Sequence, residues 1–163
     1  MSAKIEAMKI FTQFGLKRLE WDLQKIDDKN LDWKINSHAN SIRWLLIHIS
    51  MILNVYLPRA ITNNLNYLPD NWPKNYHEDM DLKLTEILED VEAGKNKSLK
   101  GFQDLTSESL EEHIDWYIGD EKRETYLMIL VSEILHHEGQ IAAIIGLKDR
   151  IDGNPPKIIP PET

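Results

Sequence analysis

The stretch Tyr126–Ile144, YLMILVSEILHHEGQIAAI, decides the fold. It contains no proline, and its apolar pattern predicts one long helix. Positions three and four residues apart share a helix face, and the face expected to meet the core carries a carboxylate and an imidazole between apolar ends: Tyr126, Leu130, Glu133, His137, Ile141 and Ile144. A carboxylate among core residues is unfavourable unless it is paired or binds a metal ion. Glu133 and His137 are therefore either an ion pair one turn apart or part of a site.

Composition narrows the class of protein. The chain of 163 residues is long enough for one domain with a sizeable core, and its charged, amphipathic start does not resemble a secretion signal. It has no run of about eighteen uncharged apolar residues, so no transmembrane helix and no membrane partner are expected. The absence of cysteine excludes disulfides, cysteine zinc ligands and cysteine nucleophiles. Any metal site must use histidine and carboxylate, and a cytoplasmic location is the default.

The charge balance argues against nucleic acid as a partner. The chain has 19 basic and 27 acidic residues, a formal net charge of −8, and its longest basic-rich stretch, Lys95–Lys100, is short. Proteins that bind nucleic acid need a concentrated basic face to neutralise phosphates. The acidic surface mainly favours solubility.

Two helices are predicted in the first third of the chain. The first spans about residues 3–26, with apolar positions in steps of three and four and Thr12 as the one weak point. The second follows an N-cap at Asn36 or Ser37 and should end before Pro58, because the residue preceding a proline avoids helical geometry. One face of the second helix again holds a single imidazole among residues that are uncharged at neutral pH: Ser41, Leu45, His48, Ile52 and Tyr56.

The remainder of the chain supplies the other two helices. The third is expected from near Met80 to about Leu105, and the fourth ends at Gly146. Residues 59–79, rich in asparagine and proline, form a connection of unusual length unless it is a lid, a binding loop or a crossing of the molecule. Residues 113–118 fit an extended segment packed over the helices.

Four amphipathic helices predict an all-α fold, because each apolar stripe must be buried against the others. We therefore expect one four-helix bundle over residues 1–151, with long connections that allow a crossover topology. Residues 152–163 hold four prolines and are expected to form a C-terminal tail rather than a domain.

Two segments resemble the DinB-like (YfiT-like) family. Residues 41–49, SIRWLLIHI, preceded by Trp33, look like the second helix of these proteins, and residues 133–140, EILHHEGQ, look like their fourth-helix signature with paired histidines and Gly-Gln. The resemblance covers about residues 1–148 and implies a four-helix bundle with a crossover.

The resemblance also implies a metal site. In the family, one histidine of the second helix and two of the fourth, four residues apart, hold a divalent ion; these positions fall on His48, Glu133 and His137. Glu133 stands where the family usually has histidine, and Glu138 where it often has arginine. Zinc or nickel is the expected ion, with iron or manganese as alternatives. His136 and Gln140 are candidates to support His137 from outside the ligand set.

The glutamate preserves a workable ligand set. Two histidines and one carboxylate are used by catalytic zinc and by non-haem iron. Two neutral imidazoles and one carboxylate leave a divalent ion with a net charge of +1, so we expect a weaker Lewis acid than with three histidines.

Two functions follow from the resemblance. The first is a metal-dependent enzyme related to thiol transferases and isomerases, which acts on a small-molecule substrate together with a low-molecular-weight thiol held at the open metal position. The alternative is a non-catalytic stress-response bundle that binds a metal or small ligand. Exposed apolar positions on the first and third helices would allow a homodimer in either case.

Overall fold

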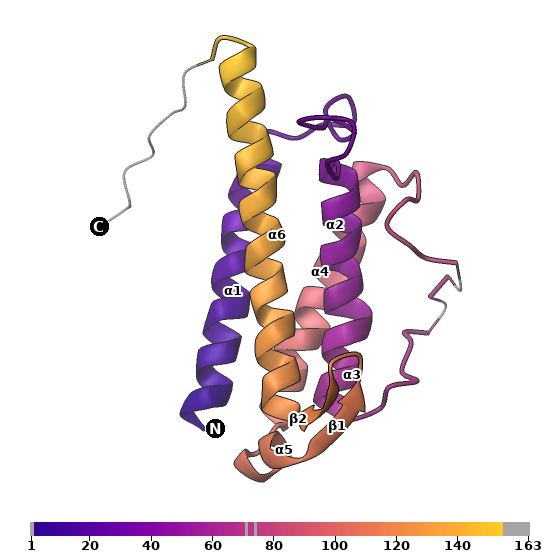
Figure 1. Cartoon of the computed structure of the whole chain (residues 1–163), viewed down its shortest axis with the longest axis vertical. Helices are drawn as coiled ribbons and strands as arrows, with labels where there is room; N and C mark the ends of the chain where they lie inside the picture. Colours follow the sequence, from indigo (N-terminus) through magenta and orange to yellow (C-terminus); the bar gives the residue numbers. More distant parts are fainter. Residues whose placement is uncertain (1, 71, 74, 155–163) are drawn as a thin grey trace.

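Four long helical segments run along one another in the computed structural model, which describes residues 2–70, 72–73 and 75–154 (Figure 1). They are α1 (Ala3–Leu23), α2 (Ile42–Met51) with its continuation, α4 (Leu84–Gly101) and α6 (Arg123–Ile151). Helix α1 packs on α6, and α2 packs on both α6 and α4. The all-α four-helix bundle is confirmed. The last residues of the expected tail, 155–163, lie outside the described part.

The connection between the second and third long helices runs from one end of the bundle to the other. Helices α1 and α6 point the same way, whereas α2 and α4 both point the opposite way (Figure 1). The chain between Asn63 and Lys83 must therefore return along the outside of the bundle before α4 begins, as the predicted crossover topology requires. Its start, Asn63, has a left-handed backbone (φ 52°) that ends the preceding helix.

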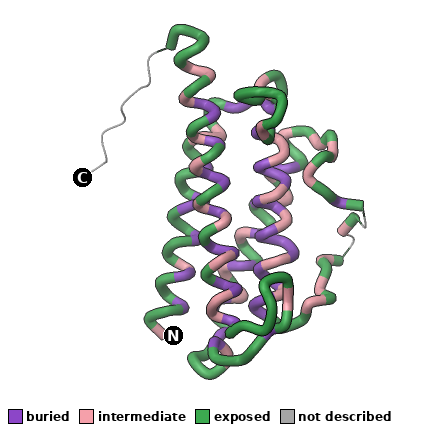
Figure 2. The backbone as a smooth tube through the Cα atoms, in the orientation of Figure 1, coloured by how far each residue is buried: buried purple, intermediate pink, exposed green. Residues whose placement is uncertain are grey.

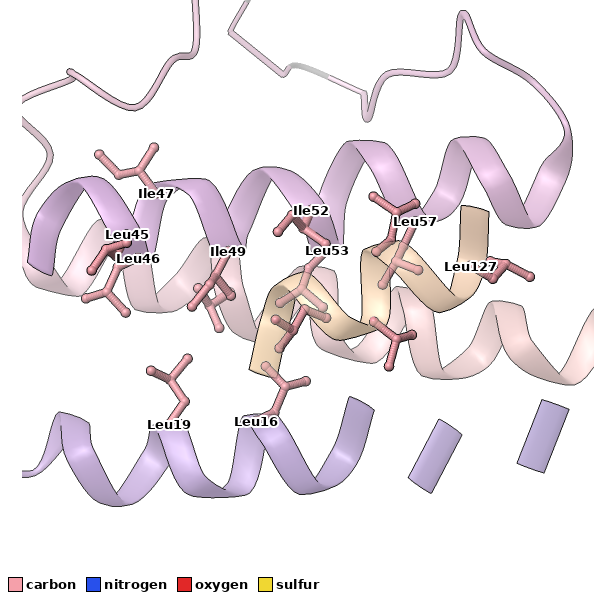
Figure 3. Close-up of a cluster of buried hydrophobic side chains, with 14 of the residues drawn as sticks. Leu16, Leu19, Leu45, Leu46, Ile47, Ile49, Ile52, Leu53, Leu57 and Leu127 are labelled. Carbon is pink, nitrogen blue, oxygen red and sulfur yellow. The ribbon is translucent and has the colours of Figure 1, made fainter. Parts of the chain in front are cut away.

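The core is formed by the predicted apolar stripes. Buried residues face inward along each long helix (Figure 2), and leucines and isoleucines from α1, α2 and α6 meet in one cluster (Figure 3). Thr12 is buried within the stripe of α1, where its hydroxyl donates to the Met8 carbonyl at 2.8 Å. This bond satisfies a polar group that would otherwise be costly in the core.

The second helix departs from its predicted bounds at both ends. It begins at Ile42, after an N-cap in which Ser41 Oγ accepts from Trp44 N–H at 3.1 Å, rather than after Asn36 or Ser37. It does not stop before Pro58. A π-helical turn (Ile52–Tyr56) leads directly into α3 (Leu57–Thr62), so the helical path is continuous from Ile42 to Thr62.

The π-turn explains how the helix passes Pro58. Leu57 N–H donates to Ile52, five residues back, and Pro58 sits in the first turn of α3, where its missing N–H is tolerated. The Leu53 carbonyl accepts instead from Ser98 Oγ of α4, at 2.8 Å. A side chain from another helix thus replaces part of the backbone bonding that proline removes.

Two further helix bounds differ from prediction. Helix α4 begins at Leu84 rather than near Met80, with Lys83 N–H donating to Glu86 Oε2 at 2.8 Å across its first turn. Helix α6 continues past Gly146 to Ile151 and is followed by Gly153, whose φ of 77° suits glycine. Gly146 keeps helical geometry, so glycine alone did not mark the end.

A short cap closes one end of the bundle. It comprises α5 (Ser107–Glu111) and a hairpin of β1 (His113–Trp116) with β2 (Gly119–Lys122), antiparallel with Trp116 opposite Gly119. The predicted extended segment is confirmed for 113–116, whereas the second strand was not predicted. Gly119 has a φ of 102°, at which a residue with a side chain would be strained, and it therefore permits the tight turn of the hairpin.

Two segments, Ile42–Thr62 and Arg123–Ile151, are long and apolar enough to cross a membrane by length and composition. In the bundle, 72% and 44% of their most apolar windows are buried. Core helices of a bundle pass the same test, so this is weak evidence for a span.

Candidate metal centre

The structure brings the three predicted ligands together from two antiparallel helices. His48 lies on α2, and Glu133 and His137 lie one turn apart on α6. One ligand atom from each side chain lies within 4.8 Å of the others. The imidazole centroids of the two histidines are 4.7 Å apart.

His137 presents a free nitrogen to this group. Its Nδ1–H donates to Gln140 Oε1 at 2.9 Å, which leaves the lone pair on Nε2. Nε2 is buried and makes no hydrogen bond; Glu133 Oε2 is 3.2 Å away but is not aligned for one. Burial lowers the pKa of His137 and outweighs the hydrogen bond to Gln140, which raises it. The neutral imidazole, the form that binds metals, is therefore favoured.

His48 is held by a residue that sequence analysis did not identify. Its Nδ1 lies 2.8 Å from Glu78 Oε1, in the crossover segment, and its ring stacks on Trp44 with centroids 5.1 Å apart. Burial raises the pKa of Glu78, but the hydrogen bond from His48 and a backbone hydrogen bond outweigh it and leave the pKa below its ordinary value. The ionised carboxylate can only accept, so His48 Nδ1 carries the proton and Nε2 is available as a ligand.

Glu133 is less buried than its place on the apolar stripe predicted. Its side chain is 41% exposed, compared with 9% for His137. The stripe reaches the surface at this point because a pocket opens beside it. The carboxylate therefore combines access to solvent with proximity to both histidines, and the expectation of a core-facing Glu133 was wrong.

The neighbouring polar residues of α6 have separate roles. Gln140 is exposed but bonds His137, as described, whereas His136 is exposed and has only an edge contact with the His137 ring, at 5.0 Å between centroids. Glu138 is 2% exposed and points toward α1, where Arg18 Nε lies 3.0 Å from its Oε2. Glu138 thus belongs to the packing of α1 on α6 and not to the ligand group.

A pocket of about 430 Å³ adjoins the ligand group. Its walls come from the continuous helix of Ile42–Thr62, from α6 and from the turn of the hairpin: His48, Ile52, Tyr56, Arg59, Trp116, Tyr117, Ile129, Leu130 and Glu133. Two ligand residues therefore form part of its wall, so a bound molecule would lie against the metal position.

Comparison with known proteins identifies the family. A family model described as the DinB superfamily matches residues 13–141. The chain belongs to the DinB superfamily. The fourth-helix signature and His48 both lie inside the matched range.

Solved structures of similar shape agree with this DinB-superfamily assignment. A DinB-like protein from Bacillus subtilis has a TM-score of 0.69 at 17% identity, over 92% of this chain and 94% of the other. A conserved protein from Enterococcus faecalis has a TM-score of 0.69 at 13% identity, over 90% of this chain and 97% of the other. At these identities the likeness shows the fold alone. No curated protein matched the chain.

The donor set of this DinB-superfamily protein fits a divalent ion. Donors bound to one zinc ion at about 2.0–2.2 Å lie about 3–4 Å apart, so the three side chains need only small rotations to converge. The buried, unpartnered Nε2 of His137 is the clearest sign of fit, because a buried polar atom without a partner is unfavourable unless a ligand satisfies it. Each histidine is also held through its other nitrogen, as ligating histidines usually are.

Proposed function

We propose that this chain binds one divalent metal ion through His48, Glu133 and His137 and is an enzyme that joins a low-molecular-weight thiol to a small electrophilic substrate. The observation that carries the proposal is the convergence of three donor atoms within 4.8 Å, with His137 Nε2 buried and unpartnered. Zinc or nickel suits two imidazoles and a carboxylate, and iron or manganese is the alternative. We expect this chemistry in the cytoplasm.

In this proposal each residue of the site has a separate role. A bound ion would offer an open position at which a thiol loses its proton and becomes nucleophilic. Glu78 and Gln140 fix the two imidazole rings, and Glu133 reduces the net positive charge. The adjoining pocket would hold the electrophile and exclude part of the water around it.

Elemental analysis of the purified, untagged protein tests the site. We expect close to one equivalent of metal in the wild type and its loss in His48→Ala and Glu133→Ala, with His136→Ala as a matched control that retains it. Thiol-transfer assays would then compare the wild type with His48→Ala and His137→Ala, at unchanged circular dichroism. Absence of metal, with none taken up from added zinc or nickel, would contradict the proposal and leave Glu133 and His137 as a polar pair.

A non-catalytic stress-response bundle that binds a metal or small ligand is the second candidate. Two departures from the family pattern favour it: Glu133 in place of histidine and Glu138 in place of arginine. In this function the ion mainly stabilises the fold, since a ligand that binds only the folded state raises its stability. Removal of the metal by a chelator would then lower the unfolding temperature, while thiol-transfer activity would be absent from fully loaded protein.

We also propose that two copies pair through the outer face of α1. Ile10, Phe14 and Trp21 share that face, and each is about half exposed. Met128 of α6 adds an exposed apolar residue on a helix that packs against α1. The described part of the third long helix, α4, has no large apolar residue of this exposure, so we place the contact on α1 and α6 rather than on the first and third helices.

A further inference from the structure

The pocket beside the ligand group is elongated along two antiparallel helices. His48, near the start of the Ile42–Thr62 segment, contacts His137 in the middle of α6. Near the end of that segment, the Ile61 carbonyl accepts from Arg123 Nη1, at the start of α6, at 3.3 Å, so the two helices are antiparallel. The pocket wall on that segment runs from His48 to Arg59, about 16 Å along the helix at about 1.5 Å per residue. The metal position and Arg59 therefore lie toward opposite ends.

Arg59 places an uncompensated positive charge on the pocket wall. Its Nε–H donates to the Tyr67 carbonyl at 3.0 Å, which orients the guanidinium and leaves both terminal nitrogens without a hydrogen-bond partner in the described residues. Three other arginines are each paired with a carboxylate: Arg18 with Glu138, Arg43 with Asp32, and Arg123 with Glu112. Within residues 2–70, 72–73 and 75–154, no carboxylate lies within 4 Å of Arg59.

The wall between the two ends is apolar and aromatic. Ile52, Ile129 and Leu130 supply aliphatic surface. Tyr56 and Trp116 meet edge to face with centroids 6.1 Å apart. This surface favours a hydrocarbon or aromatic body and offers few partners to a polar one.

We propose that the substrate of this site is a carboxylic acid with an apolar or aromatic body, bound with its carboxylate on the terminal nitrogens of Arg59 and its other end toward His48 and Glu133. This inference rests on the proposed function, because it names the substrate class of the same site. The two free guanidinium nitrogens match the two oxygens of a carboxylate. Glu133 and Glu78 at the other end offset the two positive charges of the proposed ion, so Arg59 is the uncompensated cation in the pocket wall and fixes the direction in which the acid lies.

Equilibrium binding of simple probes tests the inference on the full chain. Phenylacetate, phenylbutyrate and phenylhexanoate are titrated by calorimetry against wild type, Arg59→Gln, Arg59→Lys and Arg150→Gln, beside the neutral amide of each acid. The side chain of Arg150 is exposed and bonds only to the Gly146 carbonyl among the described residues, so it is a matched arginine outside the pocket. We expect at least one acid to bind roughly tenfold or more tightly than its amide, as a charge-assisted hydrogen bond implies.

The variants identify the group responsible. Arg59→Gln should reduce the affinity for the acid to that for the amide and leave the amide unchanged, Arg59→Lys should keep part of the preference, and Arg150→Gln should behave as wild type. Equal affinity for acid and amide in the wild type, an equal loss in Arg150→Gln, or no binding of any probe at millimolar concentration would overturn the inference. Circular dichroism of Arg59→Gln and Arg59→Lys shows that each is folded before binding is compared.

Repetition of each titration on metal-free and zinc-loaded protein separates the two proposals. Acid selectivity that depends on Arg59 in both forms supports the inference whether or not the metal is confirmed. Selectivity that appears only with zinc and survives Arg59→Gln shows the acid bound to the ion, which overturns the role of Arg59 and leaves the metal site in place.

Discussion

His48 Nδ1 lies 2.8 Å from Glu78 Oε1, although the two residues are separated by 30 positions and Glu78 belongs to the crossover segment rather than to a helix. The carboxylate fixes both the tautomer and the orientation of the imidazole. It also ties the crossover segment to the bundle beside the proposed ligands. The longest connection in the fold is thus part of the site.

Removal of Glu78 should weaken metal binding without removing a ligand. We expect Glu78→Ala to reduce metal affinity about 10- to 100-fold, in the range found when such supporting bonds are lost. Glu78→Gln keeps a hydrogen-bond acceptor without the charge, so its metal affinity should lie between that of wild type and that of Glu78→Ala. Competition with a chromophoric chelator measures the affinity, and Asp79→Asn is the exposed neighbouring control. Unchanged affinity in Glu78→Ala would show that His48 needs no such support.

Two helical glycines should respond in opposite ways to alanine. A Cβ on Gly94 would lie 2.6 Å from Asn54 Nδ2 and 2.7 Å from Leu53 Cβ, at the π-turn, so Gly94→Ala should lower the free energy of unfolding by about 1–3 kcal/mol. A Cβ on Gly139 would meet nothing within 4 Å, so Gly139→Ala should raise it by about 0.5–1 kcal/mol. Urea unfolding of both variants measures the difference. Stabilisation by Gly94→Ala would mean that α4 can move away from the π-turn at little cost.

The carboxyl group of Asp22 should make stability depend on pH. Burial, and then the charge and hydrogen bond of Glu138, raise its pKa to about 6. The folded state therefore holds this proton more tightly than the unfolded state, and its contribution to stability declines as pH rises from about 4 to about 6. Because Asp22 is partly exposed, we expect the effect to be on the order of 1 kcal/mol.

Comparison with Asp22→Asn isolates this contribution. The variant should gain stability relative to wild type as pH rises through 6, measured by urea unfolding at pH 4, 5, 6, 7 and 8. Asp104→Asn, at an exposed position, should follow the wild-type profile. Parallel profiles for wild type and Asp22→Asn would exclude a raised pKa at Asp22.

The proposed contact through α1 can be broken at one residue. Phe14 is 52% exposed, and a lysine there should convert a dimer to a monomer in sedimentation velocity, because two buried charges would face each other across a symmetric interface. Leu68→Lys, at a comparably exposed position in the crossover segment, should leave the oligomeric state unchanged. A monomeric wild type at high protein concentration would exclude the contact.

The sequence identified the three proposed ligands but not the residues around them, Glu78 beside His48 and Arg59 in the pocket wall. Sequence analysis could find His48, Glu133 and His137 because each lies on a periodic helix face, where the spacing predicts the direction of the side chain. The resemblance to the family then placed all three in one site. Glu78 carried no such signal, because its position depends on the path of an irregular connection. Arg59 follows His48, Ile52 and Tyr56 along one helix wall, but an end at Pro58 excluded it from that helix.

The sequence by itself determined the number of long helices, their buried faces and the need for a long connection, since these depend on local periodicity and on the burial of apolar surface. Tertiary structure decided where the helices stop. The Ile42–Thr62 segment passes Pro58 because a π-turn and a hydroxyl from α4 satisfy backbone groups that no local pattern reveals. It also decided that Glu138 faces α1 while Glu133 faces the pocket, because the direction of a side chain into core or cleft depends on which helix lies beside it.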